Sequence, residues 1–429
     1  MKYLPINNKL FIENRKRLAA RMKPNAVAIF NSNDIMPTNA DGTMLFRQNS
    51  DIFYFSGVDQ EESTLLLFPD APKPEWKEIL FIRETNEQIL TWEGHKLDKS
   101  QAKEVSGIDN VVWNESMAAL LPQIIFEADH IYLNSNEHPR SSNQVQTSDE
   151  RFIQWIKSKF PLHHLERLAP ILSELRAIKQ SIEIELINAA IDITKKAFLR
   201  VLNFAKPGVT EYEIEAEITH EFIKNRATRH AYTPIIASGS DACVLHYNEN
   251  NKVCKDGDLL LLDFGAEYAN YAADLTRTIP INGKFTDRQK QVYKSVLHIQ
   301  AEAQKMLVEG TILDEYHKEV GKIAEAEMIK LGLLNQKDVK EQDPEKPLYK
   351  KYFMHGTSHF LGLDVHDVGK RFKPMQSGMV FTCEPGIYIK DEKFGIRLEN
   401  NILITKTGNI NLMEKIPVLL EDIEALMKD

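Results

Sequence analysis

Apolar residues recur at helical spacing along the segment that follows residue 180. Successive members of this apolar face are three or four positions apart, as expected for one side of a helix. The face consists of Ile182, Leu186, Ala189, Ile193, Ala197, Val201 and Phe204. Lys-Pro-Gly at 206–208 ends this helix, and Thr210 with Glu213 forms a capping box that begins a second helix. The pattern predicts a pair of consecutive helices.

A second helix pair is predicted farther along the chain. Thr286 with Gln289 forms another capping box, Gly310 interrupts the helical pattern, and the second helix of this pair ends near Lys330. The polar stretch 336–351 follows, and we expect it to be a loop or linker. Strand-like runs come after each pair, so the same order of elements occurs twice.

The first 150 residues have a different pattern, with short apolar runs between turn residues. These runs predict strands at 27–30, 64–68, 79–82 and 131–133. Residues 138–150 are almost free of apolar side chains and predict a surface segment near the end of a first domain. The chain is therefore expected to be an α/β (α+β) protein, with a mixed α/β domain at 1–168 and a second domain of helix pairs and strands at 169–429.

The first strand region of the second domain, residues 258–281, predicts a hairpin that carries two carboxylates. With residues 268–269 as the turn, Asp263 lies opposite Asp274. Directly opposed residues on paired strands have Cβ atoms only about 4.5–5.5 Å apart. The two carboxylates are therefore expected to be neighbours.

The second strand region, residues 378–405, predicts another hairpin with the same feature. With residues 391–392 as the turn, Glu384 lies opposite Glu399. Four acidic side chains would then lie on two hairpins of one domain.

Carboxylates gathered on apolar strands need a source of positive charge. A buried carboxylate is costly alone, and opposed carboxylates repel each other. Bridging carboxylates can hold two metal ions about 3.5–4 Å apart, which is the geometry that activates a water for hydrolysis. His355 and His359, in MHGTSHFLG, offer imidazole ligands. A single acidic residue on a strand is ordinarily a turn or edge residue, so the metal hypothesis depends on both hairpins together.

Composition and charge exclude several classes of protein. The chain has 429 residues, a net charge of −9 and 43% apolar residues, which argues against a nucleic-acid-binding face and against disorder. No apolar run approaches the roughly 18–20 residues of a membrane span, and MKYLPINNKL has no signal-peptide core. Three cysteines, Cys243, Cys254 and Cys383, fit a reducing compartment. We therefore expect a cytoplasmic protein with no nucleic-acid or membrane partner.

Several motifs resemble one enzyme family. LDFGAEYANYAADLTRT, MHGTSHFLGLDVHD, CEPGIYI and GIRLENN together resemble the pita-bread metallopeptidases, and among them the aminopeptidase P family. FRQNSDIFYFSG, at 46–57, is similar to the aminopeptidase P N-terminal domain. The resemblance implies that the second domain is a pita-bread domain, in which helix pairs pack on a curved antiparallel sheet.

The resemblance also implies a set of metal ligands. In that family Asp274 and Glu399 would bridge two divalent ions, and the full ligand set would be Asp263, Asp274, His359, Glu384 and Glu399. Four carboxylates with one imidazole favour Mn²⁺, with Co²⁺ or Zn²⁺ as alternatives. A metal-bridging hydroxide would attack the peptide bond, with Glu384 as general base.

Four further residues match outer positions of the same family. His246 and His366 would contact the substrate and the developing oxyanion, and His355 would support the same pocket. Arg397 would orient the metal-binding carboxylates, with a surface salt bridge as the alternative role.

The activity implied is hydrolysis of the N-terminal Xaa-Pro bond of peptides, by a homodimer or homotetramer. The preference for proline comes only from the resemblance, although Tyr232 and Tyr388 are candidate pocket walls. Trp92 is either a residue offered to a neighbouring subunit or a partly buried surface aromatic. Two alternatives stay open, an Xaa-Pro dipeptidase (prolidase) and a non-catalytic pita-bread peptide-binding module.

Overall fold

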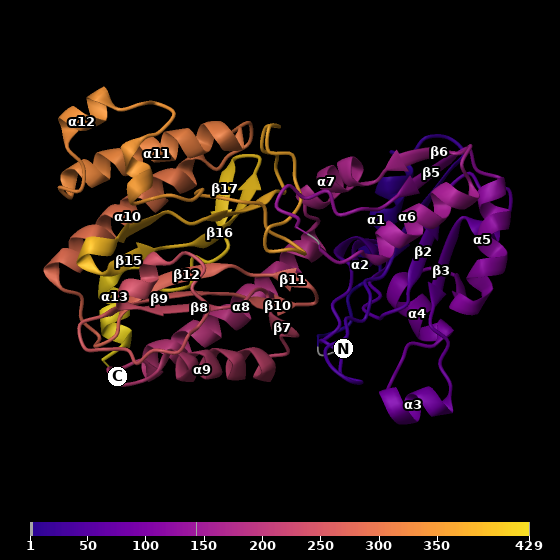
Figure 1. Ribbon diagram of the computed structural model, residues 1–429, viewed down its shortest axis with the longest axis horizontal. Coiled ribbons are helices and arrows are strands. Elements are labelled where there is room, and N and C mark those ends of the chain that lie inside the picture. The colour runs from indigo at the N-terminus through magenta and orange to yellow at the C-terminus, as the bar shows by residue number, and fades with distance from the viewer. Residues whose placement is uncertain (1–2, 143, 429) are drawn as a thin grey trace. The chain divides into compact units, whose positions relative to one another are not determined.

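The computed structural model describes residues 3–142 and 144–428, and it separates into two compact units between Leu175 and Arg176 (Figure 1). The predicted boundary between residues 168 and 169 lies directly before helix α7, Ala169–Ala177. No helix among the described residues combines the length and the apolar character that crossing a membrane requires.

The N-terminal unit is built on a mixed six-stranded sheet in the order β4-β3-β2-β1-β5-β6. Its strands are β1 Ala26–Asn31, β2 Thr64–Leu67, β3 Glu78–Ile82, β4 Asn110–Trp113, β5 His130–Leu133 and β6 His164–Arg167. β2 is antiparallel to both of its neighbours, whereas the β3–β4, β1–β5 and β5–β6 pairs are parallel. All four strands predicted in this part of the sequence are present, because each apolar run is buried within the sheet.

Among the described residues, six helices accompany this sheet, and all of them except α3, which has no buried residue, contribute to the core of the N-terminal unit. They are α1 Lys9–Ala19, α2 Ser50–Ser56, α3 Glu87–Glu93, α4 Lys99–Ser106, α5 Met117–Phe126 and α6 Ser148–Lys159. One apolar cluster joins the sheet to α5 and α6, through residues such as Ile29, Phe81, Ile124 and Ile156. A capping box between Thr147 and Glu150 begins α6.

The second unit contains the two predicted helix pairs. The pairs are α8 Ser181–Phe204 with α9 Glu211–Lys224, and α10 Asp287–Met306 with α11 Leu313–Lys330. Both predicted capping boxes are formed, at Thr210 and at Thr286. The segment predicted as a loop at 336–351 also holds a short helix, α12 Gln336–Glu341, which Asn335 caps. The last helix is α13, Leu420–Leu426.

Short strands lie between these helix pairs in Figure 1, with α8 and α9 on one side and α10 and α11 on the other. The strands form the sheets β12-β9-β8, β11-β10-β7, β13-β16-β17 and β14-β15. Their bounds are β7 Arg229–His230, β8 Ile235–Ser238, β9 Leu259–Phe264, β10 Ala266–Tyr268, β11 Tyr271–Ala272, β12 Leu275–Pro280, β13 Val380–Cys383, β14 Gly386–Ile389, β15 Phe394–Arg397, β16 Asn400–Thr405 and β17 Gly408–Asn411. The predicted fold class is confirmed.

The predicted register of the first hairpin is wrong. Asp263 pairs with Thr276, not with Asp274. The turn consists of Ala269 and Asn270, one residue later than predicted, and both have positive φ values of 51° and 64°. Two consecutive left-handed residues are typical of the tight turn that suits the twist of a hairpin. Asp274 is therefore two residues nearer the turn than Thr276, the residue that pairs with Asp263.

The predicted register of the second hairpin is confirmed. Cys383 pairs with Asn400 and Gly386 pairs with Arg397, so the chain keeps one register on both sides of Glu384 and Glu399. Pro385 has no N–H to donate, which accounts for the break between β13 and β14 at this position. The break leaves both glutamates outside the regular ladders.

At Gly265 the two strands of the first hairpin lie too close together to leave room for a side chain. Replacing Gly265 tests this geometry. An added Cβ would lie 1.8 Å from the Ala273 carbonyl oxygen, which belongs to the backbone and cannot rotate away. We expect Gly265→Ala to lower the free energy of unfolding by about 3 kcal/mol, the upper range for overpacking.

Urea unfolding of the purified variant measures this loss. Gly208→Ala is the control, because its Cβ meets open space and only its φ of 95° opposes a side chain, at about 1–2 kcal/mol. Equal losses in the two variants would contradict the steric argument.

Candidate metal centre

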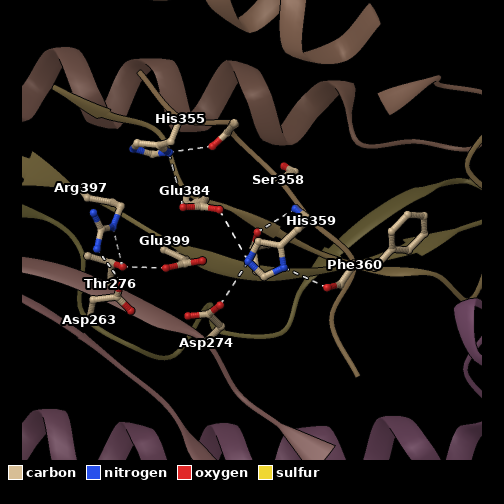
Figure 2. A network of polar contacts seen from close by, with 12 residues as sticks. Asp263, Asp274, Thr276, His355, Ser358, His359, Phe360, Glu384, Arg397 and Glu399 are labelled. Carbon is tan, nitrogen blue, oxygen red and sulfur yellow. Dashed lines mark hydrogen bonds and ion pairs between the residues drawn. The ribbon is translucent and has the colours of Figure 1, made fainter. Parts of the chain in front are cut away.

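All five predicted ligands come together in the second unit, although they arrive from separate elements (Figure 2). Asp263 is in β9 and Asp274 directly precedes β12, whereas Glu384 and Glu399 flank the β14–β15 hairpin. His359 Nε2 lies 3.4 Å from Asp274 Oδ2 and 3.6 Å from Glu384 Oε1. Ligand atoms of Asp274, His359 and Glu399 all lie within 4.8 Å of one another. The sequence analysis expected both hairpins to contribute carboxylates to one site, and this geometry agrees with that expectation.

Tyr232 connects the two aspartates of the first hairpin. Its hydroxyl oxygen is 2.6 Å from Asp263 Oδ1 and 2.6 Å from Asp274 Oδ1. A hydroxyl has one proton, so it cannot donate to both carboxylates at the same time. Without a cation, one of these two carboxylates would have to hold a proton itself.

Glu399 has an unsatisfied oxygen at the centre of the cluster. Its Oε2 accepts a 2.6 Å hydrogen bond from Thr276 Oγ1. Its Oε1 is buried and has no hydrogen-bond partner among the residues that the structure describes. A buried carboxylate oxygen without a partner is costly, whereas a cation would satisfy it. Four carboxylates and one imidazole therefore fit divalent metal ions that prefer oxygen and nitrogen ligands.

Burial and mutual repulsion shift the protonation of these carboxylates. Burial, followed by the charge of Asp263, raises the pKa of Asp274. Burial and the charge of Asp274 raise the pKa of Glu399, and burial and the charge of Glu399 raise the pKa of Glu384. A divalent cation would act in the opposite direction, because it favours the charged carboxylates.

A chain of hydrogen bonds runs along one side of the cluster. Arg397 is only 4% exposed, forms an ion pair with Asp263 and donates to Tyr388 Oη at 2.7 Å. Tyr388 Oη lies 2.8 Å from His355 Nε2, and His355 Nδ1 lies 3.7 Å from Glu384 Oε2. Arg397 thus reaches both hairpins.

His355 is held in its neutral form by this arrangement. Burial, with the charge of Arg397, lowers the pKa of His355 to about 3. A neutral ring can donate from Nδ1 to the Gly356 carbonyl, at 2.8 Å, and accept from Tyr388 at Nε2. His355 is therefore a hydrogen-bonding group beside Glu384 across the ordinary pH range.

The other two predicted outer histidines are more exposed. The His366 ring lies against that of His359, with 4.4 Å between the centroids and an angle of 85°. His246 is exposed and follows the 3₁₀ helix Gly239–Cys243, and its charge contributes to the low pKa of His355. Both rings are accessible to a bound molecule.

Two hydroxyl groups of the cluster were not identified as ligand partners from the sequence. Thr276 donates to Glu399 and accepts a 3.2 Å hydrogen bond from Arg397 Nε. Tyr232, considered only as a pocket wall, contacts both aspartates. A single hydroxyl does not reveal its distant partners in a sequence. Thr276 lies two residues after Asp274, and Tyr232 lies in the loop between β7 and β8.

Comparisons with protein families divide the chain as the fold does. Residues 185–406 match metallopeptidase family M24, and residues 11–132 match the aminopeptidase P N-terminal domain. The Xaa-Pro aminopeptidase of Haemophilus influenzae is 36% identical over 97% of this chain and 96% of that protein. The Xaa-Pro aminopeptidase of Escherichia coli is 35% identical over 98% of each chain.

Solved structures that resemble this chain are also aminopeptidases. The aminopeptidase PepP of Pseudomonas aeruginosa matches with a TM-score of 0.89 and 31% identity, over 99% of this chain and 98% of that one. Zinc-substituted Escherichia coli aminopeptidase P in complex with product matches with a TM-score of 0.88 and 33% identity, over 99% of both chains.

The raised pKa values predict how metal ions and pH act together on stability. Unfolded carboxylates lose their protons near pH 4, with ordinary pKa values of about 3.9–4.3. The folded, metal-free protein keeps protons on Asp274, Glu384 and Glu399 to higher pH. It therefore binds more protons than the unfolded chain, and its free energy of unfolding falls as the pH rises above 4.

Thermal melts at pH 5.5 and pH 8.0 with and without Mn²⁺ measure this effect. Metal ions should raise the Tm more at pH 8.0, where the carboxylates are easier to deprotonate. In an Asp274→Asn variant, the increase in Tm that Mn²⁺ causes should be smaller at both pH values. A Tm increase that is the same at both pH values in the unaltered protein would contradict the argument.

Proposed function

This chain belongs to metallopeptidase family M24, and from that premise we propose that it hydrolyses the peptide bond between an N-terminal residue and a following proline, using two divalent metal ions. The observation that carries the proposal is the cluster of Asp274, His359 and Glu399, whose ligand atoms all lie within 4.8 Å of one another and which contains the unsatisfied Glu399 Oε1. Asp263 joins this cluster through Tyr232, and Glu384 joins it beside His359. Relatives with the name Xaa-Pro aminopeptidase, similar over nearly the whole chain, supply the substrate class.

In this proposal Asp274 and Glu399 would be shared between two divalent ions, and Asp263, His359 and Glu384 would complete the ligand set, with Asp263 on one side and His359 with Glu384 on the other. The proximity of His359 Nε2 to both Asp274 and Glu384 supports this division. Mn²⁺ is the proposed metal, because most of the ligands are oxygen atoms and Cys383 contacts Gln300 and Tyr316 instead of the cluster. When bound, the ions would lower the pKa of a water and polarise the peptide carbonyl.

Glu384 is the proposed general base and acid. Its carboxylate lies beside His359 and His355 at the edge of the cluster, where it can accept a proton and later deliver it to the leaving imino nitrogen. Neutral His355, 3.7 Å from Glu384 Oε2, remains beside it without competing as a second acid near neutral pH.

The remaining residues bind and orient the substrate. His246 and His366 are exposed imidazoles near the cluster and can donate to the carbonyl oxygen as negative charge develops on it. The free amine of the substrate binds beside Asp263. Arg397 holds Asp263 and, through Tyr388, His355, so it positions one proposed metal ligand and one proposed substrate-pocket residue.

Assembly and cellular location are also proposed. Trp92, on α3 of the N-terminal unit, is 82% exposed and contributes to a homodimer or homotetramer. All three cysteines are buried and free, which supports a reducing cytoplasm.

Activity on matched peptides tests the proposed function. The protein is stripped of metal, resupplied with Mn²⁺ and assayed on an Arg-Pro-Pro peptide and on its Arg-Ala-Pro counterpart. Release of arginine only from the proline peptide, and only with metal, is the expected result. Cleavage of Xaa-Pro dipeptides alone would identify a dipeptidase, and binding without cleavage would identify a non-catalytic module.

Removal of a bridging carboxylate gives a second test. Asp274→Asn should bind one ion less per chain and lose at least the roughly 10²–10³-fold in kcat that removal of one transition-state contact causes. Asp256→Asn, at an exposed loop position of the same unit, is the control and should keep both properties. Two bound ions with normal turnover in Asp274→Asn would show that the ligand assignment is wrong.

A further inference from the structure

Two strands that belong to different sheets lie side by side at the metal centre. β12 is part of the sheet β12-β9-β8, and β16 is part of β13-β16-β17. A backbone hydrogen bond of 3.0 Å, from Glu399 N to Thr276 O, joins β12 to the residue that directly precedes β16. We call the contact between residues 274–278 and residues 397–401 the seam. Asp274 is on one side of the seam and Glu399 is on the other.

On one side of that backbone bond, a side chain takes the place of a strand backbone. Asn401 Oδ1 accepts from Asp274 N at 3.2 Å, and Asn401 Nδ2 donates to Asp274 O at 2.7 Å. An amide side chain thereby makes the pair of hydrogen bonds that a facing residue makes in an antiparallel ladder. The backbone of Asp274 is fully engaged through Asn401.

On the opposite side of the Glu399–Thr276 backbone bond, a side chain again makes the hydrogen bonds that a strand backbone would make. Thr278 Oγ1 donates to Arg397 O at 3.2 Å and accepts from Arg397 N at 3.2 Å. The pairs formed by Asp274 with Asn401, Thr276 with Glu399, and Thr278 with Arg397 follow one antiparallel register. The seam is therefore an antiparallel contact in which two of three links pass through a side chain.

Arg277 fastens the centre of the seam. Its guanidinium is fully buried and donates to Thr276 O at 2.9 Å, to Glu399 O at 2.6 Å and to Asn400 Oδ1 at 2.8 Å. Its Nε donates to Pro417 O at 2.8 Å. One side chain thus binds both strands and the segment that follows β17.

The seam decides how far apart the two bridging carboxylates are. Strands joined by backbone bonds lie about 4.7–4.9 Å apart, whereas an interposed side chain sets a different separation. A pair of ions can share Asp274 and Glu399 only at a narrow range of distances, and partners outside the ligand set commonly control such geometry. The lengths of the Thr278 and Asn401 side chains fix that separation at the two ends of the seam.

We propose that Thr278 and Asn401 are positioning residues that hold the seam at the width at which Asp274 and Glu399 bind the same two metal ions. This inference rests on the proposed function, because it assumes that the cluster binds a pair of ions. Neither residue belongs to the proposed ligand set, and both side chains bond backbone groups across the seam.

Thr278→Val is the sharpest test, because valine has the shape of threonine and lacks only the hydroxyl. Titration with Mn²⁺ should show one ion bound normally and the second bound about 10–100-fold more weakly, the usual effect of losing a partner outside the ligand set. Electron paramagnetic resonance of the loaded protein should change from the signal of a coupled pair to that of isolated Mn²⁺. Thr278→Ser should restore both properties.

Thr194→Val is a matched control in the same unit. Thr194 is also fully buried, and its hydroxyl likewise makes two backbone hydrogen bonds, to Ala190 O at 2.8 Å and from Ala266 N at 3.0 Å. It should lose a similar amount of stability and keep the coupled pair of ions. If Thr278→Val keeps the coupled pair, or if Thr194→Val loses it equally, the inference is overturned.

Asn401→Leu provides an independent variant if Thr278→Val does not fold. It removes both links to Asp274 at nearly constant size and should weaken the second ion in the same way. Retention of the coupled pair in Asn401→Leu would also overturn the inference. If the unaltered protein binds two ions and cleaves Xaa-Pro peptides, such a result refutes only the seam. If the unaltered protein binds no pair of ions, the proposed function and the inference fail together.

Discussion

Mutual repulsion among buried carboxylates is the constraint on which the second unit depends. Asp263, Asp274 and Glu399 are buried and Glu384 is partly buried beside them, where like charges oppose one another strongly. The chain offsets part of this cost with Arg397, with hydroxyl donors and with raised pKa values. The rest is left for metal ions, so the same crowding that weakens the metal-free fold creates affinity for divalent cations.

The elements that hold the carboxylates could be predicted because their signals are local. The capping boxes at Thr210 and Thr286 and the apolar face of α8 depend on residues three or four positions apart. The β14–β15 register was also predicted correctly, because the expected turn at Asp391 and Glu392 lies at the centre of the observed turn between Ile389 and Phe394. The first hairpin was misplaced because Ala269 adopts a left-handed conformation that alanine rarely takes, and Asn270 alone gave little indication of it.

The contacts between distant segments could not be predicted in the same way. Nothing in the sequence indicates that the Thr278 hydroxyl hydrogen-bonds the backbone of Arg397, or that the Asn401 side chain hydrogen-bonds the backbone of Asp274. The two residues of each pair are more than a hundred positions apart. Tyr232 and Thr276 have the same limitation, since an uncharged hydroxyl is unremarkable until its neighbours are known. The sequence therefore indicates which residues could bind metal ions, whereas the hydrogen bonds that orient these residues are seen only in the tertiary structure.

The contact between Arg277 and the Pro417 carbonyl has a consequence for biosynthesis. A ribosome releases the chain from its N-terminus, and the N-terminal unit can fold while the rest is still being made. The guanidinium of Arg277, however, lacks one of its buried acceptors until residue 417 has left the exit tunnel. The second unit therefore cannot give this buried cation its full set of acceptors until the segment around residue 417 has been synthesised and has folded back over a separation of 140 residues.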